Sequence, residues 1–190
     1  MLEDLTPAGL FSLAEQNHLR MEGMHLFEQG LTSGDTSGFV AFVEALIVQE
    51  PPRLQLLHDL AEDLQQRLLS LREYHFDVRE RVIRTLQDNY RIDLTPLTPP
   101  DALERYHLLA AGDVMAFAAA QGTTFETADL PLVRKMVEAS LQMAAQLHQD
   151  IQSTARLHQM VLDWFDAMSA TVGRQYWTSR VLRQHDNLPL

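Results

Sequence analysis

The longest regular pattern in this sequence is a heptad repeat of apolar residues between positions 52 and 90. Its two rows are Leu57, Leu64, Leu71 and Val78, and, four residues later in each repeat, Ala61, Leu68, His75 and Val82. Residues at this alternating spacing line one side of an α-helix and are typical of helices that pack along a shared seam. No proline or glycine follows Pro52 in the stretch, so we predict one continuous helix over 52–90.

A second apolar row runs beside the first along the same stretch. It consists of Leu69, Phe76, Ile83 and Tyr90. A helix with two apolar flanks needs neighbours on both flanks. We therefore expect the 52–90 helix to lie centrally in the fold.

Residues 129–183 carry another heptad pattern, in which no proline follows Pro131 and the only glycine is Gly173. Its first row is Leu130, Val137, Ala144, Ile151, His158, Phe165 and Val172, and its partner row includes Val133, Leu147, Val161 and Met168. A helix of roughly 50 residues is about 75 Å long at 1.5 Å per residue, which is more than one small domain covers. We expect its ends to pair with the 52–90 helix or with a second copy of the chain.

Shorter helices are expected before and between these two. Thr6 and Pro7 favour the start of a helix, and Gly30 favours its end. The predicted elements are a helix over 7–29, a loop over 31–38 and a short helix over 39–48.

Three prolines in 93–101 predict a hinge between two halves of the chain. Beyond it we expect a helix in 102–109, an interruption at Gly112 and a short helix over 113–122. The expected fold is therefore all-α, a helical bundle in a single domain over residues 1–190.

Composition narrows the functional classes. The chain has 190 residues and a formal net charge of −11, from 26 acidic and 15 basic residues, and such a surface repels phosphate backbones and anionic membranes. It contains no cysteine, which excludes disulfides and thiolate chemistry. The first residues lack the pattern of a signal peptide, and no stretch is long and apolar enough to span a membrane. We expect a cytoplasmic protein that binds neither nucleic acid nor membranes.

The stretch LLHDLAED at 56–63 contains a His58-Asp59 pair followed by Glu62 and Asp63. It resembles the signature of the HD-domain phosphohydrolases, an all-helical, metal-dependent family. The resemblance implies that His58 and Asp59 bind a divalent cation such as Mn, Fe or Co. An upstream histidine (His25 or His18) and a downstream aspartate (Asp129 or Asp113) would complete the ligand set, and Glu62 would orient a water. Imidazole and carboxylate ligands leave open positions for water and phosphate. In the heptad register, however, Asp59, Glu62 and Asp63 face solvent.

A second candidate metal set follows the Glu-x-x-His motif that carboxylate-bridged iron proteins use on helices. Its members are Glu15, His18, Glu22 and His25 in the first predicted helix, and Glu104 and His107 further on. The alternative is a solvated helix face that carries weak side-chain pairs.

The third group of candidates lies on the predicted seams and near the C-terminus. A histidine in an apolar seam can fix helix register or respond to pH, and large aromatic residues anchor protein interfaces. The expected interface residues are Leu64, Leu71, His75, Ile151, His158, Trp164, Phe165 and Trp177. These patterns favour a non-enzymatic helical scaffold, adaptor or regulatory protein, without a cofactor, that binds protein partners and forms a homodimer. A metal-dependent hydrolase and a non-haem iron protein remain as alternatives.

Overall fold

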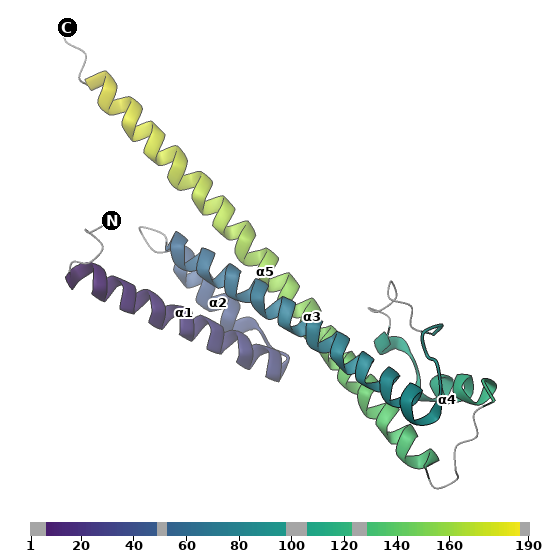
Figure 1. Ribbon diagram of the computed structural model, residues 1–190. Helices are drawn as coiled ribbons and strands as arrows, with labels where there is room; N and C mark the ends of the chain where they lie inside the picture. The colour runs from purple at the N-terminus through teal and green to yellow at the C-terminus, as the bar shows by residue number, and fades with distance from the viewer. Residues whose placement is uncertain (1–6, 49–52, 98–105, 123–128, 187–190) are drawn as a thin grey trace. The chain divides into compact units, whose positions relative to one another are not determined.

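The computed structural model describes residues 7–48, 53–97, 106–122 and 129–186, with side chains from residue 13 to residue 174 within these ranges. Every regular element in the described ranges is helical (Figure 1). The five α-helices are α1 (Pro7–Ser33), α2 (Ser37–Ile47), α3 (Leu54–Tyr90), α4 (Ala111–Ala120) and α5 (Leu130–Asp186). The all-α prediction and both long helices are thereby confirmed.

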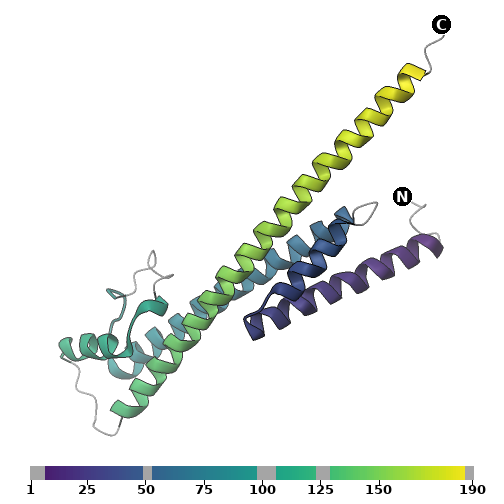
Figure 2. The same cartoon turned by 180° about the vertical axis from the view of Figure 1, so that it is seen from behind.

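The chain divides into two compact units, and both long helices contribute to each. Unit 1 comprises Met1–Gln66 and Thr154–Leu190, and unit 2 comprises Arg67–Ser153. Within each unit, α3 and α5 pack side by side (Figure 2). The helices run antiparallel, since Leu86 near the end of α3 shares a core with Val133 near the start of α5.

The heptad seam of α3 is buried along its whole length. All eight predicted seam positions, from Leu57 to Val82, have at most 6% of their surface exposed. Burying a leucine or valine side chain contributes about 1.5–3 kcal/mol, so this seam stabilises the α3–α5 pairing in both units.

The second apolar row of α3 is only partly covered. Ile83 is buried, but Leu69 and Phe76 are 42% and 44% exposed. The prediction of two apolar flanks is therefore wrong for this part of α3, because no described element covers that flank at Leu69 and Phe76.

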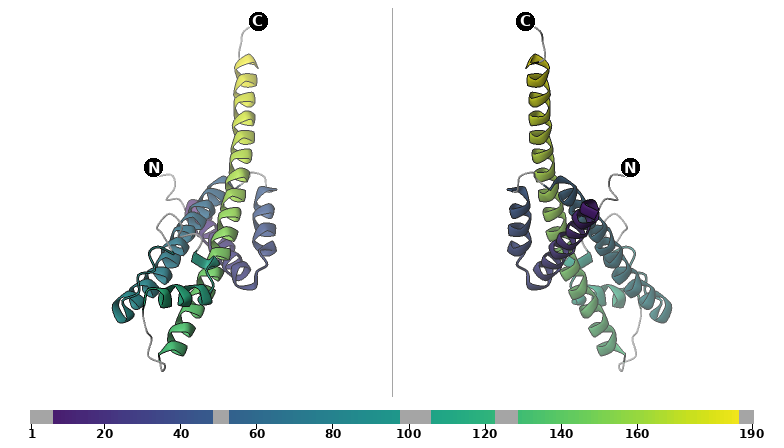
Figure 3. Two further views of the ribbon diagram at one scale, coloured as in Figure 1. Left: turned by 90° about the vertical axis from the view of Figure 1, so that its right-hand side faces the viewer. Right: turned by 90° about the vertical axis from the view of Figure 1, so that its left-hand side faces the viewer.

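Unit 1 joins the α1–α2 hairpin to the first part of α3 and the last part of α5 (Figure 3). Its core is formed by aromatic and aliphatic residues of all four helices, including Phe27, Phe39, Leu60, Leu64 and Val161. Arg20 of α1 donates two hydrogen bonds to the Asp63 carboxylate of α3, both at 2.6 Å. Such two-pronged arginine–carboxylate pairs fix geometry as well as adding attraction.

Gly30 does not end the first helix, contrary to the sequence prediction. It lies inside α1, and a Cβ atom there would be 3.0 Å from the Thr36 Cα. The glycine permits the close approach of the chain at the turn into α2. The helix ends instead before Gly34, whose φ of +77° is in the left-handed region that favours glycine. The predicted loop is accordingly shorter, and α2 begins at Ser37.

Unit 2 begins where α3 continues and ends in a helix-terminating turn. Arg91 has a φ of 55°, and the Ile92 amide donates a hydrogen bond to the Leu86 carbonyl at 3.2 Å. This bond and the burial of Ile92 against the core define a Schellman-type end. The turn directs the chain towards the short α4.

Two predictions about the region around α4 are wrong. Gly112 does not interrupt a helix, because it is the second residue of α4, where the first turn tolerates glycine. Of the helix expected in 102–109, residues 106–108 form a 3₁₀ turn that buries Tyr106. The rest of the predicted hinge and of that helix, residues 98–105, lies outside the described ranges.

Within the described ranges, no helix combines the length and the apolar character that a membrane span requires.

Candidate functional site

The last part of α5 continues beyond the apolar core of unit 1 (Figure 1). Trp164 and Phe165 are the last residues of α5 that pack against that core. None of the residues 166–174, whose side chains are described, belongs to a core cluster. We call residues 166–186 the free end of α5.

The apolar pattern of α5 nevertheless continues into the free end. Met168 and Val172 occupy the next positions of the two heptad rows, and both are half-buried. Tyr176 and Trp177 follow in the sequence. The side chain of Trp177, a predicted interface residue, lies outside the described ones.

Gly173 is the one glycine of α5, and the chain itself gives no reason for it. A Cβ atom at this position would meet nothing within 4 Å. A glycine in a helix interior costs about 1 kcal/mol relative to alanine. This cost makes sense where another backbone must approach the helix closely.

The other predicted interface residues lie in or beside the chain's own core. Leu64 is fully buried in unit 1, and Leu71 and His75 are both 4% exposed in unit 2. Ile151 packs against the small cluster that contains Leu71. His158 is half-buried, and burial lowers the pKa of its imidazole.

His58, Asp59 and Glu62 form a group of possible metal ligands. One ligand atom of each lies within 4.8 Å of the others. Their positions on successive turns of α3 explain this closeness, because residues one and four apart share a helix side. The His58 ring also lies 5.7 Å from the Phe165 ring, between centroids, so it covers part of the apolar contact between α3 and α5.

The remaining residues of the HD-type set are not part of this group. His25 is exposed on α1, and Asp129 lies in unit 2. The nearest charged partner is Arg20, whose pKa is raised by its hydrogen bonds to Asp63 and by the charges of Asp59 and Glu62. This guanidinium offsets part of the negative charge that a cation would need.

The Glu-x-x-His ladder of α1 lies on the surface. Glu15, His18, Glu22 and His25 are all exposed, and Glu15 accepts a hydrogen bond from Arg53 at 2.7 Å. Glu104 lies outside the described residues. His107 stacks on His148, with ring centroids 3.7 Å apart and an interplanar angle of 17°.

A buried polar layer in unit 2 was not found from the sequence. The Tyr106 hydroxyl and the Ser140 hydroxyl are hydrogen-bonded at 3.0 Å, and Arg79, 4% exposed, donates to Glu80. Burial raises the pKa of the Tyr106 phenol. Ser140 and Thr154 continue the partner row of α5, so extending the heptad register through polar positions finds both.

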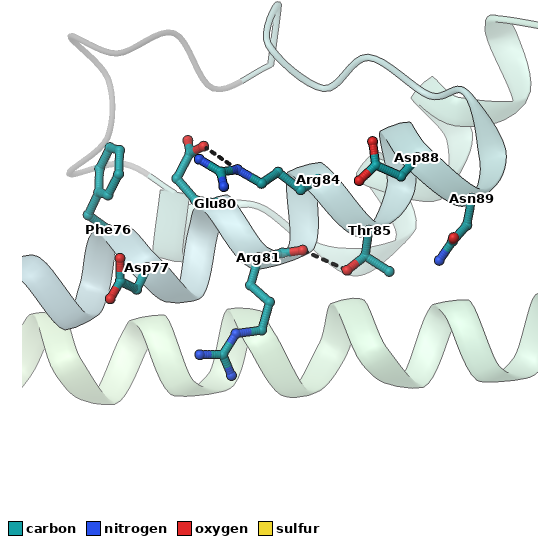
Figure 4. A pocket seen from close by; sticks show the side chains of 8 residues that line it. All are labelled: Phe76, Asp77, Glu80, Arg81, Arg84, Thr85, Asp88 and Asn89. Atoms are coloured by element: carbon teal, nitrogen blue, oxygen red, sulfur yellow. Dashed lines mark hydrogen bonds and ion pairs between the residues drawn. The ribbon is translucent and has the colours of Figure 1, made fainter.

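The described surface of α3 also carries an open hollow of about 470 Å³ in unit 2 (Figure 4). Its lining residues are Phe76, Asp77, Glu80, Arg81, Arg84, Thr85, Asp88 and Asn89. Arg84 is paired with Glu80 at 3.7 Å, and Thr85 donates a hydrogen bond to the Arg81 carbonyl. All eight residues come from one helix and their charges are mixed, so they form no convergent catalytic set.

Comparison of the chain with family models, with curated proteins and with solved structures finds no match. The functional argument therefore rests on the residues and geometry of this chain.

Proposed function

We propose that this chain is a non-enzymatic helical assembly protein that acts through protein–protein contacts made by the free end of α5, first of all with a second copy. One observation carries the proposal: the apolar rows of α5 continue past Phe165, where the core of unit 1 ends.

The lengths of the paired segments support the same conclusion. In unit 1, α5 runs from Thr154 to Asp186 and α3 only from Leu54 to Gln66. At 1.5 Å per residue these segments are about 50 Å and 20 Å long. An uncovered apolar helix of this length gains stability by pairing with another helix.

The test compares two substitutions within the free end by light scattering of the full chain. Val172→Asp places a charge in the apolar row and removes two buried valines per dimer, at about 1.5 kcal/mol each. We expect the dimer to dissociate about 100-fold more readily. Ala167→Asp is the matched control, because Ala167 is exposed, and this variant should remain dimeric.

The proposal fails if both variants have the mass of the wild-type chain at every concentration. Far-UV circular dichroism keeps the result interpretable, since both variants should retain the wild-type helix content.

The group His58, Asp59 and Glu62 supports a second candidate function, divalent-cation binding, with phosphohydrolase chemistry as its sharpest form. The closeness of the three possible ligand atoms favours it. Imidazole with carboxylates suits Mn, Fe or Co.

Elemental mass spectrometry of protein purified without chelator tests this candidate. Metal binding predicts about one ion per chain, lost in His58→Ala but kept in His18→Ala, whose histidine is exposed on α1. Absence of metal from the wild-type protein, with only a slight change in melting of His58→Ala, would remove the metal candidate and leave the assembly proposal standing.

A further inference from the structure

Resting on the proposed self-association, we infer that two copies pair through the free ends of α5 in antiparallel orientation, with the two-fold axis at Gly173. In such a pair, a residue that precedes the axis by a given number of positions lies level with the partner residue that follows it by the same number. The sequence around Gly173 can therefore be checked level by level.

The charges agree with this centre at two independent levels. Asp166 precedes Gly173 by seven residues and Arg180 follows it by seven. Asp163 precedes Gly173 by ten residues and Arg183 follows it by ten. Antiparallel pairing about Gly173 thus brings each aspartate level with an arginine of the partner, and the two-fold axis generates four such pairs.

The described part of the helix leaves these aspartates available. Asp163 and Asp166 are both exposed on α5. Asp163 accepts only a hydrogen bond from Gln159 of its own helix at 2.8 Å among the printed contacts of unit 1. Opposite charges that meet across a helix pair favour one orientation over the other.

Residue size agrees with the same centre. Gly173 has open space around it, so a partner backbone can approach there. Ala170 and Ser169 precede it by three and four residues, and Tyr176 and Trp177 follow it by three and four. Each small residue therefore lies level with an aromatic residue of the partner, which is the alternation that lets two helices interlock.

Parallel pairing loses each of these matches. It brings Asp166 level with the partner's Asp166 and Arg180 level with the partner's Arg180. Like charges that face each other are destabilising, and the aromatic residues would meet one another at the same level. The second copy in antiparallel orientation is the occupant that the charges and sizes favour.

Charge exchange is the first test, measured as the dimer dissociation constant of the full chain. Asp166→Arg and Arg180→Asp should each weaken the dimer at least about tenfold, because each creates like-charged pairs at two levels. The double variant Asp166→Arg/Arg180→Asp should regain the wild-type affinity. Equal weakening by the single and double variants would overturn the inference.

Chemical cross-linking is the second test, and the absence of native cysteine makes it clean. A chain with Asp166→Cys is mixed with an isotope-labelled chain with Arg180→Cys and treated with a short bismaleimide. Antiparallel pairing predicts cross-links between the two chain types and none within either, since residues 166 and 180 are about 21 Å apart along one helix.

The outcomes separate this inference from the proposed function. A dimer in which Asp166→Cys cross-links to itself is parallel, which overturns the antiparallel inference but leaves self-association intact. A wild-type chain that stays monomeric overturns both.

Discussion

The two ends of α5 carry the same kind of sequence but have different surroundings. Near its start, Val133, Val137 and Ala144 are at most 1% exposed and share a core with α3. Near its end, Met168 and Val172 continue the same rows beyond the core of unit 1. The comparison shows that a heptad pattern specifies a need for a partner helix, but not whether the partner belongs to the same chain.

A single type of substitution at two positions of one row gives the sharpest break in this comparison. Val137→Asp buries an unpaired carboxylate in the core of unit 2, and we expect it to lower the free energy of unfolding by at least ~3 kcal/mol. Val172→Asp should change the mass of the assembly and leave the monomer fold intact. Urea denaturation followed by circular dichroism measures both.

Ala139→Asp is the control for Val137→Asp, because Ala139 is exposed two residues further along α5. Equal destabilisation by Val137→Asp and Val172→Asp would mean that the two ends do not differ in the way described.

A smaller effect is expected from the buried polar layer on the covered half of α5. Tyr106→Phe removes the hydroxyl bonded to Ser140 and should cost about 1 kcal/mol. Tyr74→Phe, at a half-exposed tyrosine, should cost less. If Tyr106→Phe is neutral, the hydrogen bond contributes nothing to the stability of unit 2.

The Tyr106 bond also gives a pH signature. Burial raises the pKa of this phenol above its ordinary value of 10.0, so the folded protein holds a proton that the unfolded chain releases above that pH. Stability from this group is complete below pH 10 and is lost as the pH rises through the folded pKa. The difference between wild type and Tyr106→Phe should shrink in that range.

The smallest effect concerns His158, which precedes the free end. Burial lowers the pKa of its imidazole from 6.5, so below that pH the unfolded chain binds a proton that the folded chain does not. Stability is therefore highest above pH 6.5 and falls as the pH decreases. His158→Gln should reduce this fall, seen as melting temperatures that differ more from wild type at pH 5 than at pH 7.5. A constant difference across that range would exclude titration of His158 as the cause.

Much of the fold follows from local spacing. The eight seam positions of α3 were predictable because a helix that buries one side repeats its apolar residues at heptad spacing. The same logic failed for Leu69 and Phe76, since a row of apolar residues does not reveal which part of it finds a neighbour. Gly30 was misplaced because the sequence shows its flexibility and not the close approach of Thr36.

The candidate sites were less predictable for a related reason. His58 and Asp59 are adjacent in sequence, so their closeness to Glu62 follows from one helix turn. Tyr106 and Ser140 are 34 residues apart, and only the folded chain brings them together. The free end of α5 was expected from its length, whereas the position at which its cover stops depends on tertiary packing.

Sedimentation equilibrium of the wild-type chain over a wide concentration range tests the central claim most directly. The account predicts that the mass rises from that of the 21.7 kDa chain to twice that value. A mass that stays at 21.7 kDa up to the highest concentration would contradict it, because the free end of α5 would then need no second copy.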